Sequence, residues 1–279
     1  MSQWADQWRD FVRDTSYVHN LREEKISNDQ FWRSYGIYDR VLMHSGYPGE
    51  ILSKISSFIS PEATFLDIGA GTGAFAIPLS RKTCRTIAVD PSEYQLQILL
   101  EKAHQEGLRN IFAIQKEWKD VQPSEIHCMN ISEDGDFGVD ISAVDIPAVD
   151  YSLAAYSLFD EDIENFLTKM IDLTRKGIFI VFRAESFDSL NEFAYGPRPN
   201  ADYLCLYHIL KDMGYQFEVI LFPRNYYLPI DLVFTQYRFS KKGHDELLGH
   251  LSREGRLQDR EDGKWAAFSA KDALLYLIR

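Results

Sequence analysis

The sequence predicts an α/β protein, in which a mainly parallel sheet carries helices on both faces and follows a helical cap. Three observations predict this fold. Apolar runs of strand length alternate with amphipathic stretches from residue 64 to residue 222, as in βαβ units. The first run leads into a glycine-rich turn, Asp67–Gly73. Apolar residues make up 45% of the 279 residues, enough for a full core.

Residues 1–58 precede the first expected strand and are predicted to form the N-terminal helical cap. Trp4, Trp8 and Phe11 recur at the spacing of one helix face. A second helix is expected around Phe31–Tyr38. The turn residues Gly46–Gly49 precede a third, over 50–59.

The α/β core is expected to span residues 59–228. Its strands are expected at 64–68, 86–90, 111–115, 149–155, 177–183 and, as a sixth apolar run, 216–222. Its helices are expected at 73–81, 92–106, 161–174 and 200–213. The polar stretch 122–148 is longer than an ordinary connection, and we interpret it as a mobile flap or a small hairpin. Its acidic run 132–140 lacks the residue order of a calcium loop, so no metal site is expected.

The C-terminal part is predicted to hold a helical insertion over 229–260 and strands over 261–279. The apolar run Ala273–Ile278 is the favoured final strand, and the turn residues Asp262–Lys264 introduce this C-terminal part. The competing assignment for the final strand is Leu232–Phe239.

Composition narrows the range of partners and compartments. The net charge is −12, and Lys and Arg nowhere form a basic block, so nucleic-acid substrates are disfavoured. Three scattered cysteines form neither a disulfide framework nor a zinc pattern. Neither a signal peptide nor an apolar run long enough to span a membrane is visible. We therefore expect a cytoplasmic protein that does not bind membranes.

The glycine-rich turn predicts a nucleotide pocket, and two cofactors fit it. Gly69, Gly71 and Ala74 satisfy the pattern that cradles the pyrophosphate of NAD. Asp90, 21 residues after Gly69, suits a ribose diol in either case. Asp67 discriminates between the two cofactors. A carboxylate that lies ~4 Å from a phosphate charge is repelled by roughly 1–4 kcal/mol, which disfavours NAD. The ammonium and sulfonium of S-adenosylmethionine (SAM) would be attracted instead, so the charge favours SAM.

With these residues in place, the chain resembles the class I SAM-dependent methyltransferases. Four segments carry the resemblance in the family's order: 65–73, 87–92, 111–118 and 149–158. The resemblance implies a seven-stranded Rossmann-like sheet, whose antiparallel last strand lies between the fifth and sixth. It also implies a set of cofactor-binding residues: Asp67, Gly69, Ala70, Gly71, Asp90 and Pro91 around the turn and ribose, Glu117 and Trp118 at adenine, Ala155 at the methionine moiety, and Tyr38 or Tyr35 in an aromatic lid.

Each of these positions also has a purely structural interpretation. Asp90 is in place to cap the helix that starts near Ser92. Trp118 suits core packing and Glu117 a solvated surface. The lid aromatics suit simple packing between helices, and Tyr156 suits an ordinary strand end.

No catalytic residue can be named, because methyl transfer is mainly a matter of orientation. Candidates on the acceptor side are Arg183, which ends the fifth strand, and a later group: Tyr195, Tyr203, Tyr207 and His208. The Asn/Asp-Pro-Pro-Tyr signature of base and glutamine N-methylation is absent after the fourth strand, where Ala154–Ser157 stands. We therefore expect a methyltransferase acting on a small molecule. The alternatives are a non-catalytic SAM-binding protein and an NAD-dependent oxidoreductase.

Overall fold

The computed structural model describes residues 2–128, 148–185 and 188–279. The acidic run 132–140 and most of the stretch 122–148 lie outside the described residues, so the flap or hairpin expected there stays a prediction. None of the helices in these ranges has the length and apolar character that a membrane span requires.

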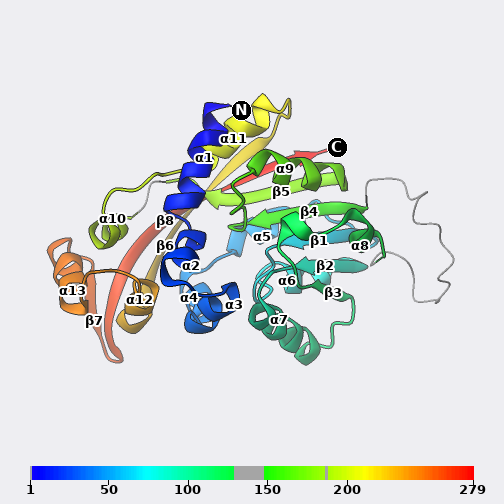
Figure 1. The fold of residues 1–279 in the computed structure, drawn as a ribbon. Helices are drawn as coiled ribbons and strands as arrows, with labels where there is room; N and C mark the ends of the chain where they lie inside the picture. The colour runs from blue at the N-terminus through cyan, green and yellow to red at the C-terminus, as the bar shows by residue number, and fades with distance from the viewer. Residues whose placement is uncertain (1, 129–147, 186–187) are drawn as a thin grey trace.

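One mixed sheet forms the centre of the molecule (Figure 1). Its strands are β1 (Thr64–Ile68), β2 (Arg85–Val89), β3 (Ile111–Ile114), β4 (Val149–Ala155), β5 (Thr174–Arg183), β6 (Glu218–Pro229), β7 (Leu257–Arg260) and β8 (Gly263–Ile278). The order along the sheet is β3-β2-β1-β4-β5-β8-β6, and β7 pairs with β8 off this path. β1 to β5 run parallel, and β8 is antiparallel to β5 and β6. The predicted seven-strand, Rossmann-like order is confirmed, with the short β7 added.

The last strand resolves the open C-terminal assignment. Gly177–Arg183 of β5 pairs with Asp272–Ile278 of β8, so the favoured terminal strand is confirmed. The competing segment is mainly helical, because Ile230–Gln236 forms α12, which buries Leu232 and Val233. Both β6 and β8 run further than the sequence predicts, and pair with each other as far as Pro229 and Trp265.

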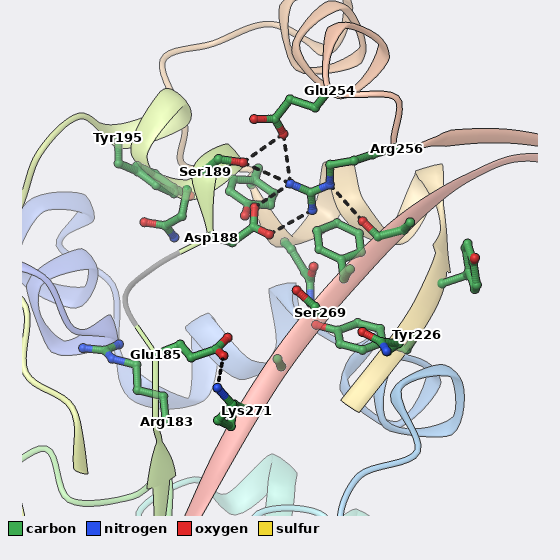
Figure 2. Close-up of a pocket in the computed structure, with 18 of the residues that line it drawn as sticks. Arg183, Glu185, Asp188, Ser189, Tyr195, Tyr226, Glu254, Arg256, Ser269 and Lys271 are labelled. Atoms are coloured by element: carbon green, nitrogen blue, oxygen red, sulfur yellow. Dashed lines mark hydrogen bonds and ion pairs between the residues drawn. The ribbon is translucent and has the colours of Figure 1, made fainter. Parts of the chain in front are cut away.

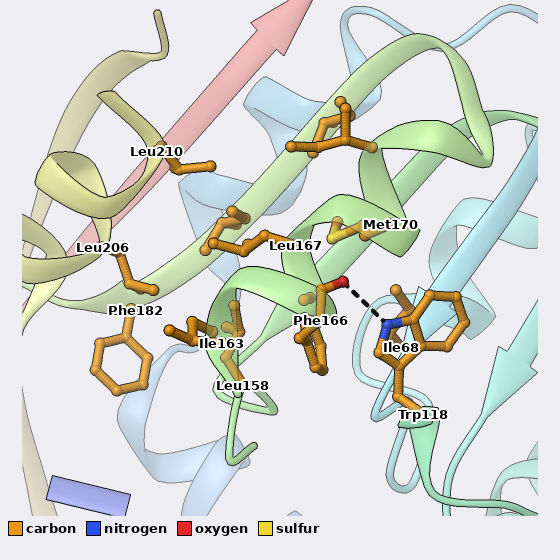
Figure 3. Packing of buried hydrophobic residues seen from close by; sticks show 14 of the residues in the cluster. Ile68, Trp118, Leu158, Ile163, Phe166, Leu167, Met170, Phe182, Leu206 and Leu210 are labelled. Carbon is orange, nitrogen blue, oxygen red and sulfur yellow. Dashed lines mark hydrogen bonds between the residues drawn. The ribbon is translucent and has the colours of Figure 1, made fainter. Parts of the chain in front are cut away.

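Helices cover both faces of the sheet (Figure 1). They are α1 (Gln3–Asp14), α2 (Tyr17–Glu24), α3 (Asn28–Ser34), α4 (Tyr38–Ser45), α5 (Gly49–Ser56), α6 (Ala76–Ser80), α7 (Glu93–Gln105), α8 (Pro123–Cys128), α9 (Ile163–Asp172), α10 (Ser189–Tyr195), α11 (Tyr203–Asp212), α12 and α13 (His244–Arg253). Alternate residues of β1 enter opposite cores: Leu66 packs in the cluster with α1, α9 and α11, and Phe65 in the cluster with α5 and α6. Figure 3 shows the first of these clusters.

The outer halves of β6 and β8 extend beyond the parallel strands, beside α12, α13 and β7 (Figure 1). A separate hydrophobic cluster joins this extension to α10 through Leu190, Leu228, Leu232 and Leu247. Ile37 from the N-terminal helices packs against the same cluster. The extension, α10 and the N-terminal helices are therefore packed against one shared cluster.

Candidate functional site

The turn after β1 takes a backbone conformation that requires glycine. Gly69 has φ 75° and Gly71 has φ 53°, both in the left-handed region. A Cβ on Gly69 would lie 2.1 Å from the Cβ of Ser157, because the ends of β1 and β4 abut there. A Cβ on Gly71 would meet nothing within 4 Å. The backbone at Gly71 is thus bare and faces open space.

That space is a cavity of about 440 Å³, here called the turn cavity. It lies at the carboxyl ends of the parallel strands, where ligands bind in open α/β sheets. All ten residues predicted to bind the cofactor line it: Tyr38, Asp67, Gly69, Ala70, Gly71, Asp90, Pro91, Glu117, Trp118 and Ala155. Positions up to 117 residues apart in sequence, Tyr38 to Ala155, are therefore brought together at one opening.

Asp67 is a buried acidic residue in the wall of the turn cavity. Its side chain is buried, and its Oδ2 atom has no hydrogen-bond partner among the described residues. Burial, and then the charge of Asp90, raise the pKa of Asp67 to about 7, against the lowering effect of the Ala76 backbone N–H. A buried carboxylate without a cation is costly. The arrangement suits a ligand that brings positive charge.

Asp90 accepts hydrogen bonds from the backbone of the glycine turn and of the segment that follows β2. Its Oδ2 accepts the N–H of Gly71 at 2.9 Å, and its Oδ1 accepts the N–H of Ser92 at 2.8 Å. Burial raises its pKa to about 6, against the lowering effect of these two hydrogen bonds. The helix-cap interpretation of Asp90 is wrong, because Ser92 is the residue that caps α7, accepting the N–H of Gln95 at 3.3 Å.

Trp118 and Glu117 differ in burial although they are adjacent. Trp118 is buried, and its indole N–H donates to the Phe166 carbonyl at 3.3 Å (Figure 3). The packing interpretation of Trp118 therefore holds alongside its place on the cavity wall. Glu117 is exposed and pairs with Lys119 at 2.6 Å. It lines the cavity from its rim.

The aromatic residues of the N-terminal helices divide between two hollows. Tyr38 lines the turn cavity together with Tyr17 and Trp32. Tyr35 lines a second, larger cavity instead. Ring contacts join Tyr35 to Tyr38 at 6.4 Å, so packing between helices also holds for these side chains.

The second hollow, here called the tyrosine cavity, has a volume of about 1300 Å³. Figure 2 shows its polar walls: Arg183, Glu185 and Lys271 on one side, and Asp188, Ser189, Glu254 and Arg256 on the other. Its tyrosines are Tyr35, Tyr156, Tyr195, Tyr226, Tyr227 and Tyr237. The last three belong to the aromatic-rich stretch 226–239, a sequence signal that lies outside the motifs named above.

Only some of the acceptor-side candidates line a cavity. Arg183 and Tyr195 line the tyrosine cavity. The expected place of Tyr203, Tyr207 and His208 at the acceptor stays a prediction, but among the described residues these three line neither cavity. The reason is that α11 packs against α1, where His208 stacks on Trp4 with ring centroids 4.3 Å apart.

Tyr156 lines both cavities, so it lies between them. Its φ of 54° is unusual for a bulky residue and costs backbone strain. Its hydroxyl donates to Asp272 at 2.5 Å, and Arg224 holds the same carboxylate at 2.5 and 3.2 Å. Asp272 is completely buried. Tyr156 is therefore more than an ordinary strand end, and a buried ion pair fixes its orientation.

Comparisons with known proteins agree with this geometry. Residues 65–133 match the family model described as a methyltransferase domain. No curated protein matches the sequence. The YcgJ protein of Bacillus subtilis is 14% identical with a TM-score of 0.55, covering 82% of this chain and 97% of its own. A candidate methyltransferase of Bacillus halodurans is 11% identical with a TM-score of 0.55, covering 81% and 96%.

A longer relative spans nearly the whole chain. Phosphoethanolamine N-methyltransferase 2 of Haemonchus contortus, solved with S-adenosylhomocysteine, is 13% identical with a TM-score of 0.53. It matches 98% of this chain and 60% of its own. At such identities the likeness to solved structures concerns the fold. The methyltransferase-domain match over residues 65–133 and the Rossmann-like methyltransferase fold are consistent with a class I SAM-dependent methyltransferase.

Proposed function

We propose that this methyltransferase transfers the methyl group of SAM to a small-molecule acceptor. SAM is bound in the turn cavity by the ten residues named above, and the acceptor in the tyrosine cavity. The observation that carries the proposal is that Tyr156, which directly follows β4, lines both the turn cavity and the tyrosine cavity. An acceptor in the larger hollow would meet the cofactor there.

The turn cavity fits SAM by charge and by shape. The unpartnered Oδ2 of Asp67 suits the cationic methionine end, and the bare backbone at Gly71 leaves room for close approach. Both oxygens of Asp90 already accept backbone N–H groups, which fixes the carboxylate while its remaining lone pairs stay available to ribose hydroxyls. SAM supplies an activated methyl group, and the chain has to orient the acceptor atom in line with it.

A small acceptor is favoured over a polymer by the place of the tyrosine cavity. Its walls come from the N-terminal helices, α10 and the β6/β8 extension. The net charge of −12 disfavours nucleic acid. We propose that residues 1–58 act as a cap, 59–228 as the SAM-binding core, 229–260 as a helical insertion and 261–279 as the strands that complete the sheet.

The test has two stages. Calorimetry should show SAM and S-adenosylhomocysteine binding to the wild type and to Asp172→Asn, an exposed control on α9, and at least tenfold weaker SAM binding to Asp67→Asn. The enzyme is then incubated with methyl-labelled SAM and separate RNA, protein and small-metabolite fractions. Label in the metabolite fraction supports the proposal. Label only in RNA or protein contradicts the small acceptor, and binding without any transfer would indicate the non-catalytic alternative.

A further inference from the structure

The aromatic rings of the tyrosine cavity are backed by the protein's own arginines. Five of its rings have a guanidinium 4.4–5.3 Å from the ring centroid. The pairs are Arg198 with Tyr195, Arg238 with Tyr35, Arg224 with Tyr226, Arg256 with Phe268 and Arg260 with Tyr227.

These arginines occupy ring faces that a cationic ligand would need. Tyr195 contacts Arg198 and also stacks on Tyr237, with centroids 5.9 Å apart. Tyr226 contacts Arg224 and stacks on Phe268 at 5.6 Å. Aromatic cages bind cations through open ring faces. Here a second cation would lie close to a guanidinium and be repelled.

The carboxylates of the cavity are already neutralised. Glu185 pairs with Lys271 at 2.7 Å (Figure 2). Asp188 holds Arg256 through two hydrogen bonds, of 2.9 and 3.0 Å, and Glu254 holds the same guanidinium at 3.2 Å. These acids therefore serve contacts between the walls, and they leave little negative charge to attract a cationic ligand.

Among the described residues, two of the arginines beside the rings have no carboxylate that neutralises them. Within the described ranges, neither Arg198 nor Arg238 has a carboxylate within ion-pair distance. The Nε atom of Arg238 is buried without a hydrogen-bond partner. Arg198 itself lines the cavity. A positive excess in this hollow contrasts with the net charge of −12 of the whole chain.

The hydroxyl groups add hydrogen-bond donors. Burial is the main cause that raises the pKa of Tyr195, Tyr226 and Tyr237, so all three phenols stay protonated at neutral pH. Phenol O–H groups and guanidinium N–H groups together suit ligand oxygens that accept several hydrogen bonds.

We propose that the tyrosine cavity binds an acceptor that carries an anionic oxygen group, a phosphate or a carboxylate, at Arg198 and the neighbouring tyrosines. The methyl-accepting atom lies toward Tyr156. This inference rests on the proposed function, because it names the acceptor class for the same site.

The test uses the full chain saturated with S-adenosylhomocysteine and three probes: inorganic phosphate, succinate and tetramethylammonium. Calorimetry should detect one or both anions binding more tightly than tetramethylammonium, and weakening as salt is added. Phosphate binding alone would assign a phosphate group, and succinate binding alone a carboxylate. Arg198→Gln should weaken the anion by about tenfold or more, and Tyr195→Phe by a few-fold, since charged hydrogen bonds are the stronger ones.

Arg253→Gln is the matched control, because Arg253 is an exposed arginine of α13 that does not line either cavity. It should bind the anion like the wild type. Tighter binding of tetramethylammonium, absence of anion binding, or an unchanged affinity in Arg198→Gln would overturn the inference. Binding of S-adenosylhomocysteine by each variant shows that it is folded. If the wild type fails to bind that ligand, the proposed function fails, while anion titrations of the ligand-free protein still test the cavity.

Discussion

Replacing Asp67 by asparagine is predicted to stabilise the ligand-free protein and to lower its affinity for SAM. The carboxylate is buried, one of its oxygens has no partner, and its pKa is raised from 3.8 to about 7. Each pKa unit corresponds to 1.36 kcal/mol, so about three units give an upper bound of roughly 4 kcal/mol for the cost of ionising Asp67 in the native state. The new amide also needs partners, and we expect a net gain of about 1–3 kcal/mol.

The raised pKa of Asp67 makes the stability of the wild type depend on pH. Because the native pKa lies above the unfolded value, the native state holds a proton that the unfolded state has already lost between about pH 4 and pH 7. The wild type should therefore lose stability as pH rises through that window, and then level off. Asp90, with a pKa of about 6, contributes a slope of the same sign in both proteins.

Urea unfolding at pH 5, 6, 7 and 8 measures the difference directly. The free energy of unfolding of Asp67→Asn should exceed that of the wild type by an amount that grows steadily from pH 5 to pH 7. The m-values of the two proteins should be similar. The SAM affinity of the wild type should fall as pH drops below 7, because binding a cation requires the ionised carboxylate. A constant difference between the two proteins across this range would refute the reasoning, and so would a variant that is less stable at pH 8.

Three further substitutions test the turn and the junction. Gly69→Ala should lower stability by about 1–3 kcal/mol in thermal unfolding, because its Cβ meets Ser157 at 2.1 Å and its φ is 75°; an unchanged melting temperature would contradict the close approach. Gly71→Ala should cost less stability, about 1 kcal/mol, but weaken SAM binding in calorimetry, since its Cβ enters open space. Tyr156→Phe should lower kcat/KM while S-adenosylhomocysteine binding stays near wild type, because the Asp272 carboxylate loses a donor at 2.5 Å; equal kinetics would exclude a role for the hydroxyl.

The turn cavity was predictable because local sequence determines it. A buried strand, a run of glycines and a helix start fix the backbone within a few residues, as Gly69 and Gly71 show. Parallel pairing of β1 with β2 and β4 then brings residues such as Asp90 and Ala155 to the same edge. Their gathering around one opening follows from the sheet order, which the resemblance supplied.

The tyrosine cavity was not predictable, because its walls depend on long-range pairing. The sequence indicated a sixth strand ending near Phe222, whereas β6 continues to Pro229 against β8. A single helix expected over 200–213 left the separate α10 unrecognised. The direction of α11 is set by its contact with α1, so the side chain of His208 could not be placed from its spacing. The positive φ of Tyr156 leaves no trace in the sequence at all.

The register of β8 connects the fold to the proposed chemistry. Asp272 lies opposite Arg183 on β5 and Phe222 on β6, and from this position its carboxylate accepts the Tyr156 hydroxyl. A slip of one residue turns every side chain to the other face of a sheet. It would put Lys271 or Ala273 in a completely buried position that now holds an ion pair. The antiparallel strand that closes the sheet thus also orients Tyr156, which lines both cavities, and breaking the buried Asp272–Arg224 pair would add to the cost of any slip in register.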